Sequence, residues 1–267
     1  MSESESKHGD GLLEIRKLTR HFGGLVAVSN LDLSIREGQF FGLIGPNGAG
    51  KTTVFNLLSG VIPPTRGEVR FAGSDITGAP PFQINRRGLA RTFQITSLFQ
   101  SFTVLENVLL GTYGVFRVNP LSSLFNTRQA RTAEREQRER SMELLDFLGL
   151  GRLRNEVARN LPLGHQRILE LAVALASSPK MLLLDEPFSG LSAEEGREMM
   201  IRIQKVREGR ITIMLVEHNI RIVMGLCDRI AVLNFGSKIA EGPFEEVSRN
   251  PEVIKAYLGS KRYAKDQ

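Results

Sequence analysis

Short apolar runs, separated by polar turns, recur along this chain and predict strands of two kinds. Residues 26–35, VAVSNLDLSI, alternate apolar and polar side chains, which indicates a strand with one buried face. Residues 40–45, FFGLIG, are apolar throughout, as expected of a strand buried on both faces. We predict further strands in the runs LLEIRKL at 12–18, GEVRFAG at 67–73, MLLLD at 181–185, ITIMLVE at 211–217 and RIAVLN at 229–234.

Helical patterns separate several of these strands. The spacing predicts a helix starting near Lys51, helices over 193–208 and 220–225, and a long, mostly helical stretch from about 97 to 178. Strands that alternate with helices imply an α/β fold with a parallel sheet, and the long helical stretch is best explained as an inserted helical subdomain. Because we find no internal repeat and no long linker, a single domain is predicted.

Composition and charge narrow the class of protein. The chain has 267 residues, a net charge of +6 and one cysteine, Cys227, so it can form no internal disulfide, which fits a reducing cytosol. No apolar run approaches the roughly 18 residues of a membrane span, and residues 1–11 lack a secretory signal and predict a short disordered tail. The most basic stretch, 128–140, is interleaved with Glu, which favours an exposed ion-paired helix, and we expect no nucleic-acid partner.

Residues 45–52, GPNGAGKT, carry the strongest chemical signal, since they match G-x-x-x-x-G-K-[ST] between a predicted strand and a predicted helix. Gly48 and Gly50 let the backbone curl so that its N–H groups point at phosphate oxygens. Lys51 would reach the outer phosphates, and the Thr52 hydroxyl would bind Mg²⁺. The predicted nucleotide-binding residues of this segment are Gly45, Asn47, Gly48, Ala49, Gly50, Lys51, Thr52 and Thr53.

Two carboxylates follow the apolar run at 181–184. Asp185 ends a predicted strand, and ligands bind at the carboxyl ends of strands in open α/β sheets, so we predict that Asp185 holds Mg²⁺. Glu186 comes next and is predicted to accept the proton of the water that attacks the γ-phosphate. Together with the phosphate loop, the segment indicates Mg²⁺-dependent hydrolysis of a nucleoside triphosphate, and the resemblance described next implies ATP as that nucleotide.

From about Leu12 to the C-terminus, the sequence resembles the ABC ATPase family, whose motifs occur here in the family's order. Gln94, in RTFQ, matches the loop glutamine that contacts Mg²⁺ or water; LPLGHQR at 161–167 and SGLS at 189–192 occupy the positions of the signature and the D-loop. His218, in VEHN, matches the switch histidine at the γ-phosphate, and Phe22, in HFGG, the aromatic residue that stacks on adenine. By this resemblance Lys51, Glu186 and His218 are catalytic, and Thr52, Gln94 and Asp185 bind the metal.

The resemblance also implies a domain layout and an assembly. It implies one ABC ATPase domain over 12–260, with a RecA-like P-loop core at about 12–95 and 179–240, an antiparallel β subdomain, and a helical subdomain at about 96–178. In this family two subunits enclose ATP, each nucleotide lying between one chain's phosphate loop and the other's signature loop. Residues from about 112 to 124 lie in the part of the subdomain that faces a permease, although ordinary packing explains them equally well.

The signature departs from the family pattern. Pro162 replaces the serine, Leu163 the first glycine and His165 the usual glutamine, while Gly164 and the following helix N-terminus remain. Ser192 replaces the common D-loop aspartate. Proline offers neither a hydroxyl nor an N–H group, so we predict that this signature serves the partner's nucleotide less well than this chain's own phosphate loop serves its own.

Several stretches closely resemble the ATPase subunit of branched-chain amino acid importers, among them GPNGAGKTTVFNLLSG, VEHNIRIVMGLCDRI and NPEVIKAYLG. The implied partners are a second, non-identical ATPase subunit, two transmembrane permease subunits and, through them, a periplasmic binding protein. The implied location is the cytoplasmic face of the inner membrane. Uptake of urea or amides, extraction of lipopolysaccharide, and a soluble ABC ATPase outside transport stay open as alternatives.

Overall fold

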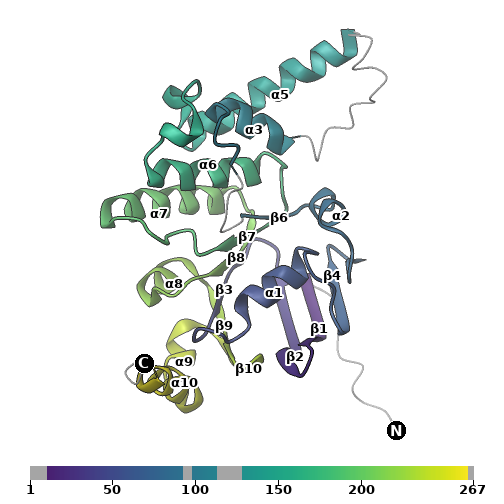
Figure 1. Cartoon of the computed structure of the whole chain (residues 1–267), viewed down its shortest axis with the longest axis vertical. Helices are drawn as coiled ribbons and strands as arrows, with labels where there is room; N and C mark the ends of the chain where they lie inside the picture. The colour runs from purple at the N-terminus through teal and green to yellow at the C-terminus, as the bar shows by residue number, and fades with distance from the viewer. Residues whose placement is uncertain (1–10, 93–97, 113–127, 264–267) are drawn as a thin grey trace.

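A six-stranded sheet forms the centre of the molecule (Figure 1). The computed structural model describes residues 11–92, 98–112 and 128–263. The strand order is β10-β9-β3-β8-β7-β6; β9, β3, β8, β7 and β6 are parallel neighbours, and β10 joins antiparallel to β9. Its strands are β3 (Phe40–Ile44), β6 (Leu89–Arg91), β7 (Met181–Asp185), β8 (Thr212–Val216), β9 (Arg229–Asn234) and β10 (Ser237–Gly242).

A second, antiparallel sheet lies beside it, in the order β2-β1-β4-β5. It contains β1 (Gly11–Phe22), β2 (Leu25–Arg36), β4 (Arg66–Phe71) and β5 (Ser74–Asp75). Along β2 the side chains of Leu31, Leu33 and Ile35 are buried and those between them are exposed, so the alternation predicts the orientation of this strand correctly. The two sheets confirm the predicted α/β class with an antiparallel subdomain.

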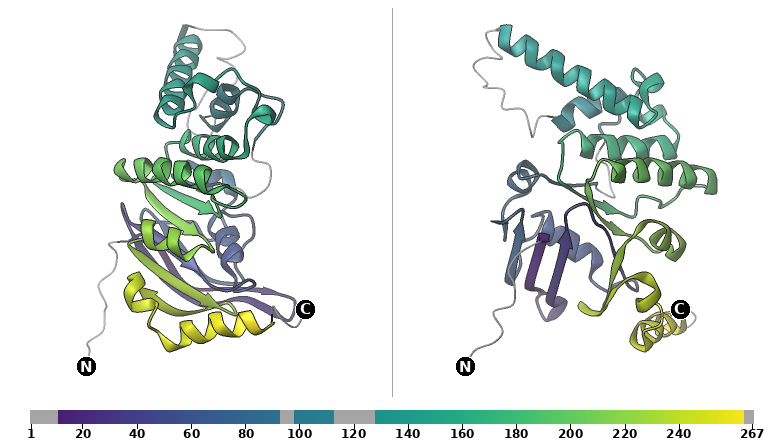
Figure 2. Two further views of the ribbon diagram at one scale, coloured as in Figure 1. Left: turned by 90° about the vertical axis from the view of Figure 1, so that its left-hand side faces the viewer. Right: turned by 180° about the vertical axis from the view of Figure 1, so that it is seen from behind.

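The helices cover the central sheet on both faces (Figure 2). They are α1 (Lys51–Leu58), α2 (Pro81–Arg86), α3 (Val104–Thr112), α5 (Arg128–Phe147), α6 (Leu163–Leu175), α7 (Ala193–Glu208), α8 (Ile220–Leu226), α9 (Phe244–Val247) and α10 (Pro251–Tyr263), with 3₁₀ turns at Gly151–Leu153 and Ala158–Asn160. Helices α3, α5 and α6 gather at one end of the molecule and α10 at the other (Figure 1). No helix in the described ranges has the length and apolar character needed to cross a membrane.

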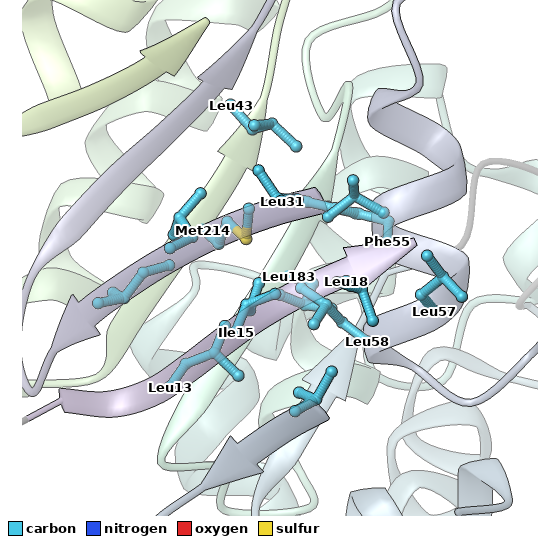
Figure 3. Close-up of a cluster of buried hydrophobic side chains, with 14 of the residues drawn as sticks. Leu13, Ile15, Leu18, Leu31, Leu43, Phe55, Leu57, Leu58, Leu183 and Met214 are labelled. Carbon is cyan, nitrogen blue, oxygen red and sulfur yellow. The ribbon is translucent and has the colours of Figure 1, made fainter. Parts of the chain in front are cut away.

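Alternating side chains of the central strands divide the core. Leu183 of β7 packs with α1 and the antiparallel sheet, where Leu18 of β1 and Phe55 of α1 meet (Figure 3). Leu182 and Leu184, on the other face of β7, join the helices α3, α5, α6 and α7. Both faces of β7 are therefore covered, which explains why its sequence is apolar throughout.

Some boundaries differ from those predicted. Strand β1 begins at Gly11, one residue inside the segment predicted as a tail. The strands β6 and β10 were not predicted, because LAR is too short to show a period and SKIAEG is a polar edge strand. The segment predicted to face a permease lies, after Thr112, outside the described residues.

Candidate functional site

The phosphate loop joins β3 to α1 and depends on glycines where the backbone passes close to its neighbours. A side chain at Gly45 would place Cβ 2.2 Å from the carbonyl oxygen of Leu233, and one at Gly50 would place it 2.4 Å from that of Ala27. Gly50 also has φ of 104°, in the region that favours glycine. Helix α1 has no side-chain N-cap and no acidic residue in its first turn, so its N-terminal N–H groups are open to an anion.

Lys51 lies inside this loop and its charge is held by backbone carbonyls. Its Nζ donates to the oxygen of Gly45 at 2.7 Å and to that of Pro46 at 2.9 Å. Burial lowers the pKa of the Lys51 ammonium, and the carboxylates of Glu186 and Asp185 oppose that shift. An ammonium group has three donors, and two of them account for these bonds, which leaves one to direct at a phosphate oxygen.

Asp185, at the end of β7, has two oxygens in different environments. Oδ2 accepts a hydrogen bond from Arg91 Nη2 at 2.8 Å, in an ion pair with both side chains buried. Oδ1 is buried and has no hydrogen-bond partner in the structure. Burial raises the pKa of the Asp185 carboxyl even though Arg91 lowers it. A buried carboxylate oxygen without a partner is the ligand that Mg²⁺ prefers, so Asp185 fits the predicted metal-binding role.

Glu186 and His218 lie against each other at the ends of neighbouring strands. His218 Nε2 is 2.5 Å from Glu186 Oε1. Glu186 has a left-handed backbone with φ of 48°, rare for this residue type, and its N–H donates to the carbonyl of Val216 at the end of β8. The fold therefore aims the predicted base and the predicted γ-phosphate sensor at one point beside the phosphate loop.

Glu217 fixes the two loops that carry this pair. Its buried carboxylate accepts the N–H of Phe188 at 3.2 Å on one oxygen and the N–H of His218 at 3.1 Å on the other. Burial raises the pKa of the Glu217 carboxyl, and these backbone hydrogen bonds oppose the shift. Glu217 thereby ties the loop after β7 to the loop after β8, and with it the relative placement of the Glu186 and His218 segments.

These elements border a cleft of about 510 Å³. Phe22, at the end of β1, lies on its rim, and the Arg20 guanidinium stacks 4.7 Å from the centre of the Phe22 ring. The cleft is lined by Phe22, Leu25, Val26, Ala27, Asn47, Gly48, Ala49, Gly50, Lys51, Thr52, Thr53, Glu186, His218 and Phe235. A polar floor of backbone N–H groups beside an apolar rim suits a nucleotide, with phosphates on the floor and a base at the rim.

Most of the residues predicted from the sequence line this cleft. Gly45, at the start of the phosphate loop, and Asp185, directly before Glu186, do not line it themselves but belong to the segments beside it. Gly164 starts α6 in the helical layer and does not line it, as expected of a residue that serves a partner's nucleotide. Gln94 lies outside the described residues. No group of three or more His, Cys, Asp or Glu side chains suited to a metal occurs in the described part of the chain, so Mg²⁺ would need hydroxyl and phosphate oxygens besides Asp185.

Sequence reasoning missed two supporting residues of the site. Arg91 is 94 positions from Asp185, and no local spacing announces their contact. Glu217 ends the apolar run ITIMLVE, and a charged residue directly beside a predicted site residue could have marked it for attention.

Comparison with known proteins assigns the chain to a family. The family model described as ABC transporter matches residues 28–189, and a second model, described as branched-chain amino acid ATP-binding cassette transporter, matches residues 237–262. The high-affinity branched-chain amino acid transport ATP-binding protein BraF of Pseudomonas aeruginosa is 43% identical over 249 residues, covering 93% of this chain and 98% of BraF.

Solved structures agree on the fold. A nucleotide-free ATP-binding cassette from an ABC transporter superposes with a TM-score of 0.81 at 31% identity, covering 92% of this chain and 98% of that one. A dimeric ATP-binding cassette bound to ADP and Pi, in a post-hydrolysis state, superposes with a TM-score of 0.71 at 27% identity, covering 86% and 98%. The phosphate loop, the two carboxylates and the histidine thus lie in a fold shared with these cassettes, and the chain belongs to the ABC transporter family as an ATP-binding, ATP-hydrolysing subunit.

Proposed function

We propose that this chain hydrolyses ATP to energise the uptake of branched-chain amino acids through a separate permease. The main support for this choice of transported substrate is the 43% identity to BraF along nearly the whole chain. The branched-chain amino acid model, which matches β10, α9 and most of α10, adds to it. The hydrolytic part of the proposal has its support in the cleft, where Lys51, Glu186 and His218 meet.

Thr52 and Asp185 would hold Mg²⁺ beside the phosphates, together with Gln94. When bound, Mg²⁺ neutralises phosphate charge that develops during transfer. The support for Asp185 is its divided environment, since Arg91 holds Oδ2 and Oδ1 stays without a partner. Thr52 is in the first turn of α1 and lines the cleft, where its hydroxyl can reach the same phosphates.

Hydrolysis then needs three actions of side chains. Lys51 donates to the outer phosphates, and Glu186 orients the attacking water and takes its proton. His218 donates to the γ-phosphate. The contact between Glu186 and His218 supports a joint action of the two side chains on the attacking water and the γ-phosphate. Asn47, Ala49 and the other loop residues bind phosphate through their backbone N–H groups.

The active form would be a dimer with a second, non-identical ATPase subunit. Each nucleotide would lie between one chain's phosphate loop and the other's signature, so Gly164 would face the partner's ATP. The post-hydrolysis dimer that resembles this chain supports such an arrangement. Two permease subunits and a periplasmic binding protein complete the assembly, which places the chain at the cytoplasmic face of the inner membrane, with no nucleic-acid partner.

Transport assays in cells that lack the chromosomal copy of this chain test the proposal. We expect the wild-type chain to restore uptake of labelled leucine, isoleucine and valine, and Glu186→Gln, expressed at the same level, to restore none. Restored uptake of urea or short amides instead would overturn the assignment of branched-chain amino acids as the cargo.

Affinity purification from native membranes adds a second readout. Recovery of a multi-helix permease and a second ATPase is expected, while recovery of ribosomes or repair factors without a membrane protein would overturn the transport role.

A further inference from the structure

Phe235 is an unusual residue for its position. It is 86% exposed, more than any other large hydrophobic residue in the described part of the chain. It lies with Gly236 in the two-residue turn between β9 and β10, where Asn234 pairs with Ser237. Phe235 has φ of 45° and Gly236 has φ of 81°. Turns with two positive φ angles favour Asn, Asp or Gly at the first position, and a bulky aromatic there is strained.

The turn is fixed to the phosphate loop by its backbone. The Gly236 N–H donates to the carbonyl of Ala49 at 3.0 Å, and the Gly236 carbonyl accepts the N–H of Ser29 at 2.8 Å. A Cβ at Gly236 would lie 2.9 Å from the Ala27 oxygen, so the turn also packs closely against β2. The backbone that carries the Phe235 ring is therefore hydrogen-bonded directly to the phosphate loop at Ala49.

The ring stands on the rim of the nucleotide cleft. Phe235 and Phe22 both line the cleft, together with Leu25 and Val26 at the start of β2. The Arg20 guanidinium already stacks on the Phe22 ring, which limits how much of that ring is left for a base. The cleft rim thus offers a second aromatic surface, carried by a different sheet from the first.

We propose that Phe235 is a second base-contacting residue, packing its ring against the purine of the bound nucleotide in addition to Phe22. This inference rests on the nucleotide occupying the cleft as described above. Stacking on an aromatic ring tolerates any base, because every base has a π-face, so Phe235 adds affinity for ATP and GTP alike and none for the phosphate chain. Loss of one base–aromatic contact corresponds to roughly 5- to 10-fold in Kd, toward the lower end of measured stacking contributions, since the ring is largely exposed.

The absence of tryptophan from the chain allows a direct optical test. Phe235→Trp introduces a single indole at the cleft, and we expect saturating ATP to change its fluorescence, whereas tripolyphosphate, which has no base, does not. Phe82→Trp is the matched control, because Phe82 is 61% exposed on α2 and does not line the cleft. Equal responses to ATP and tripolyphosphate, or no response at saturation, would overturn the proposal.

A second test measures the Kd of the isolated chain for ATP and for tripolyphosphate by calorimetry. Phe235→Ala should raise the Kd for ATP roughly 5- to 10-fold and leave the Kd for tripolyphosphate unchanged, while Phe235→Tyr should bind ATP like the wild type. If the wild-type chain binds no ATP, the nucleotide-binding role itself fails. If it binds ATP and Phe235→Ala binds equally well, the proposed subsite fails alone. An effect seen only on dimerisation would show that Phe235 contacts the partner subunit, which also overturns the proposal.

Discussion

Two helices of this chain have N-termini that are predicted to bind nucleotide, and they differ in what occupies them. At α1 the N-cap is Gly50, and neither a capping side chain nor a first-turn acid competes with phosphate. At α6 the N-cap is Pro162, also without a side-chain cap, but the Gly164 N–H donates to Glu195 Oε1 at 3.0 Å. The phosphate loop is thus left open to an anion, whereas the signature helix already holds a carboxylate of its own chain.

The carboxylate at α6 is firmly held. Glu195 forms a capping box with Ser192 at the start of α7, so its two oxygens accept N–H groups from two different helices. These hydrogen bonds, chiefly those from Ser192, lower the pKa of the Glu195 carboxyl. An intact helix N-terminus is therefore not by itself an open anion site, because its donors can be satisfied within the chain.

We call the phosphate loop with Asp185, Glu186 and His218 the open half-site, and the signature helix with Glu195 the occupied half-site. The largest effect is expected from Glu186→Gln, which removes the general base of the open half-site. Without a general base, ATP turnover should fall about 10²- to 10⁴-fold, while ATP still binds, because Gln keeps the size and one acceptor. Single-turnover hydrolysis and equilibrium ATP binding measure the two separately. Near-normal hydrolysis by the variant would remove Glu186 from the role of base.

In the complex with the second ATPase, the same substitution tests whether the two nucleotide sites hydrolyse ATP at different rates. We predict that Pro162 and Glu195 weaken this chain's signature, so the nucleotide on this chain's own phosphate loop should hydrolyse faster than the one facing Pro162. Inactivating the glutamate of this chain should therefore cost more turnover than inactivating that of its partner. Equal losses from the two single variants would contradict the asymmetry.

The next effect concerns stability, since the open half-site depends on a buried ion pair. Arg91→Met leaves the Asp185 carboxylate buried without its cation, and we expect a loss of roughly 3 kcal/mol in the free energy of unfolding. Arg16→Met is the matched control, because the Arg16–Glu14 pair is much more exposed and should cost at most about 1 kcal/mol. Urea unfolding at neutral pH measures both, and equal losses would show that the buried pair contributes nothing special.

The sequence predicts the residues that act chemically in the open half-site better than the residues that hold them in place. Lys51, Thr52, Asp185 and Glu186 belong to contiguous motifs whose chemistry dictates the spacing, so the pattern alone locates them. Arg91 contacts Asp185 across 94 positions, and only the pairing of β6 with β7 brings the two together. Such contacts depend on strand order, which hydrophobic periodicity does not specify.

The occupied half-site shows the same limit. The capping box of Ser192 and Glu195 is a local S-x-x-E pattern that the sequence could have revealed. The hydrogen bond from Gly164 to Glu195 spans 31 positions and depends on how α6 packs against α7. The helix starts at Leu163, beside the N-terminus expected at Gly164, but the partner of the Gly164 N–H group depends on tertiary packing.

A moderate effect is expected from Glu195→Ala, which opens the signature helix. Removing the carboxylate frees the Gly164 N–H and removes a negative charge where a partner's γ-phosphate would approach, so ATP-dependent dimerisation should strengthen roughly threefold. Analytical ultracentrifugation in a Glu186→Gln background, which retains ATP, measures the dimer, and Glu194→Ala, one position away, is the control. Weaker dimerisation would mean that Glu195 supports the signature.

The pH dependence of Glu195→Ala provides an internal check. A carboxyl whose pKa is lowered in the folded state adds stability that is present above the unfolded pKa of 4.5 and is lost as pH falls through the lower folded value. The wild type should therefore exceed the variant in stability at pH 6, and the difference should shrink below pH 4.5. A difference that persists unchanged into strong acid would contradict a contribution from the ionised carboxylate, because protonation removes that contribution.

The smallest effect is expected at Tyr257 of α10, which packs beside the start of the phosphate loop. Tyr257 packs with Ile44 and Val253, and its hydroxyl interacts with the Gly45 backbone. Tyr257→Phe should cost about 0.5 kcal/mol, at the lower end of the usual contribution of one hydrogen bond. Burial raises the pKa of Tyr257 to about 12 from 10, so the folded state keeps its proton where the unfolded chain loses it, and stability falls between pH 10 and 12. Cys227, with its pKa raised to about 12, titrates there too, so the informative quantity is the difference between wild type and Tyr257→Phe. That difference should narrow above pH 10, and a constant gap would show that the hydroxyl does not titrate in this window.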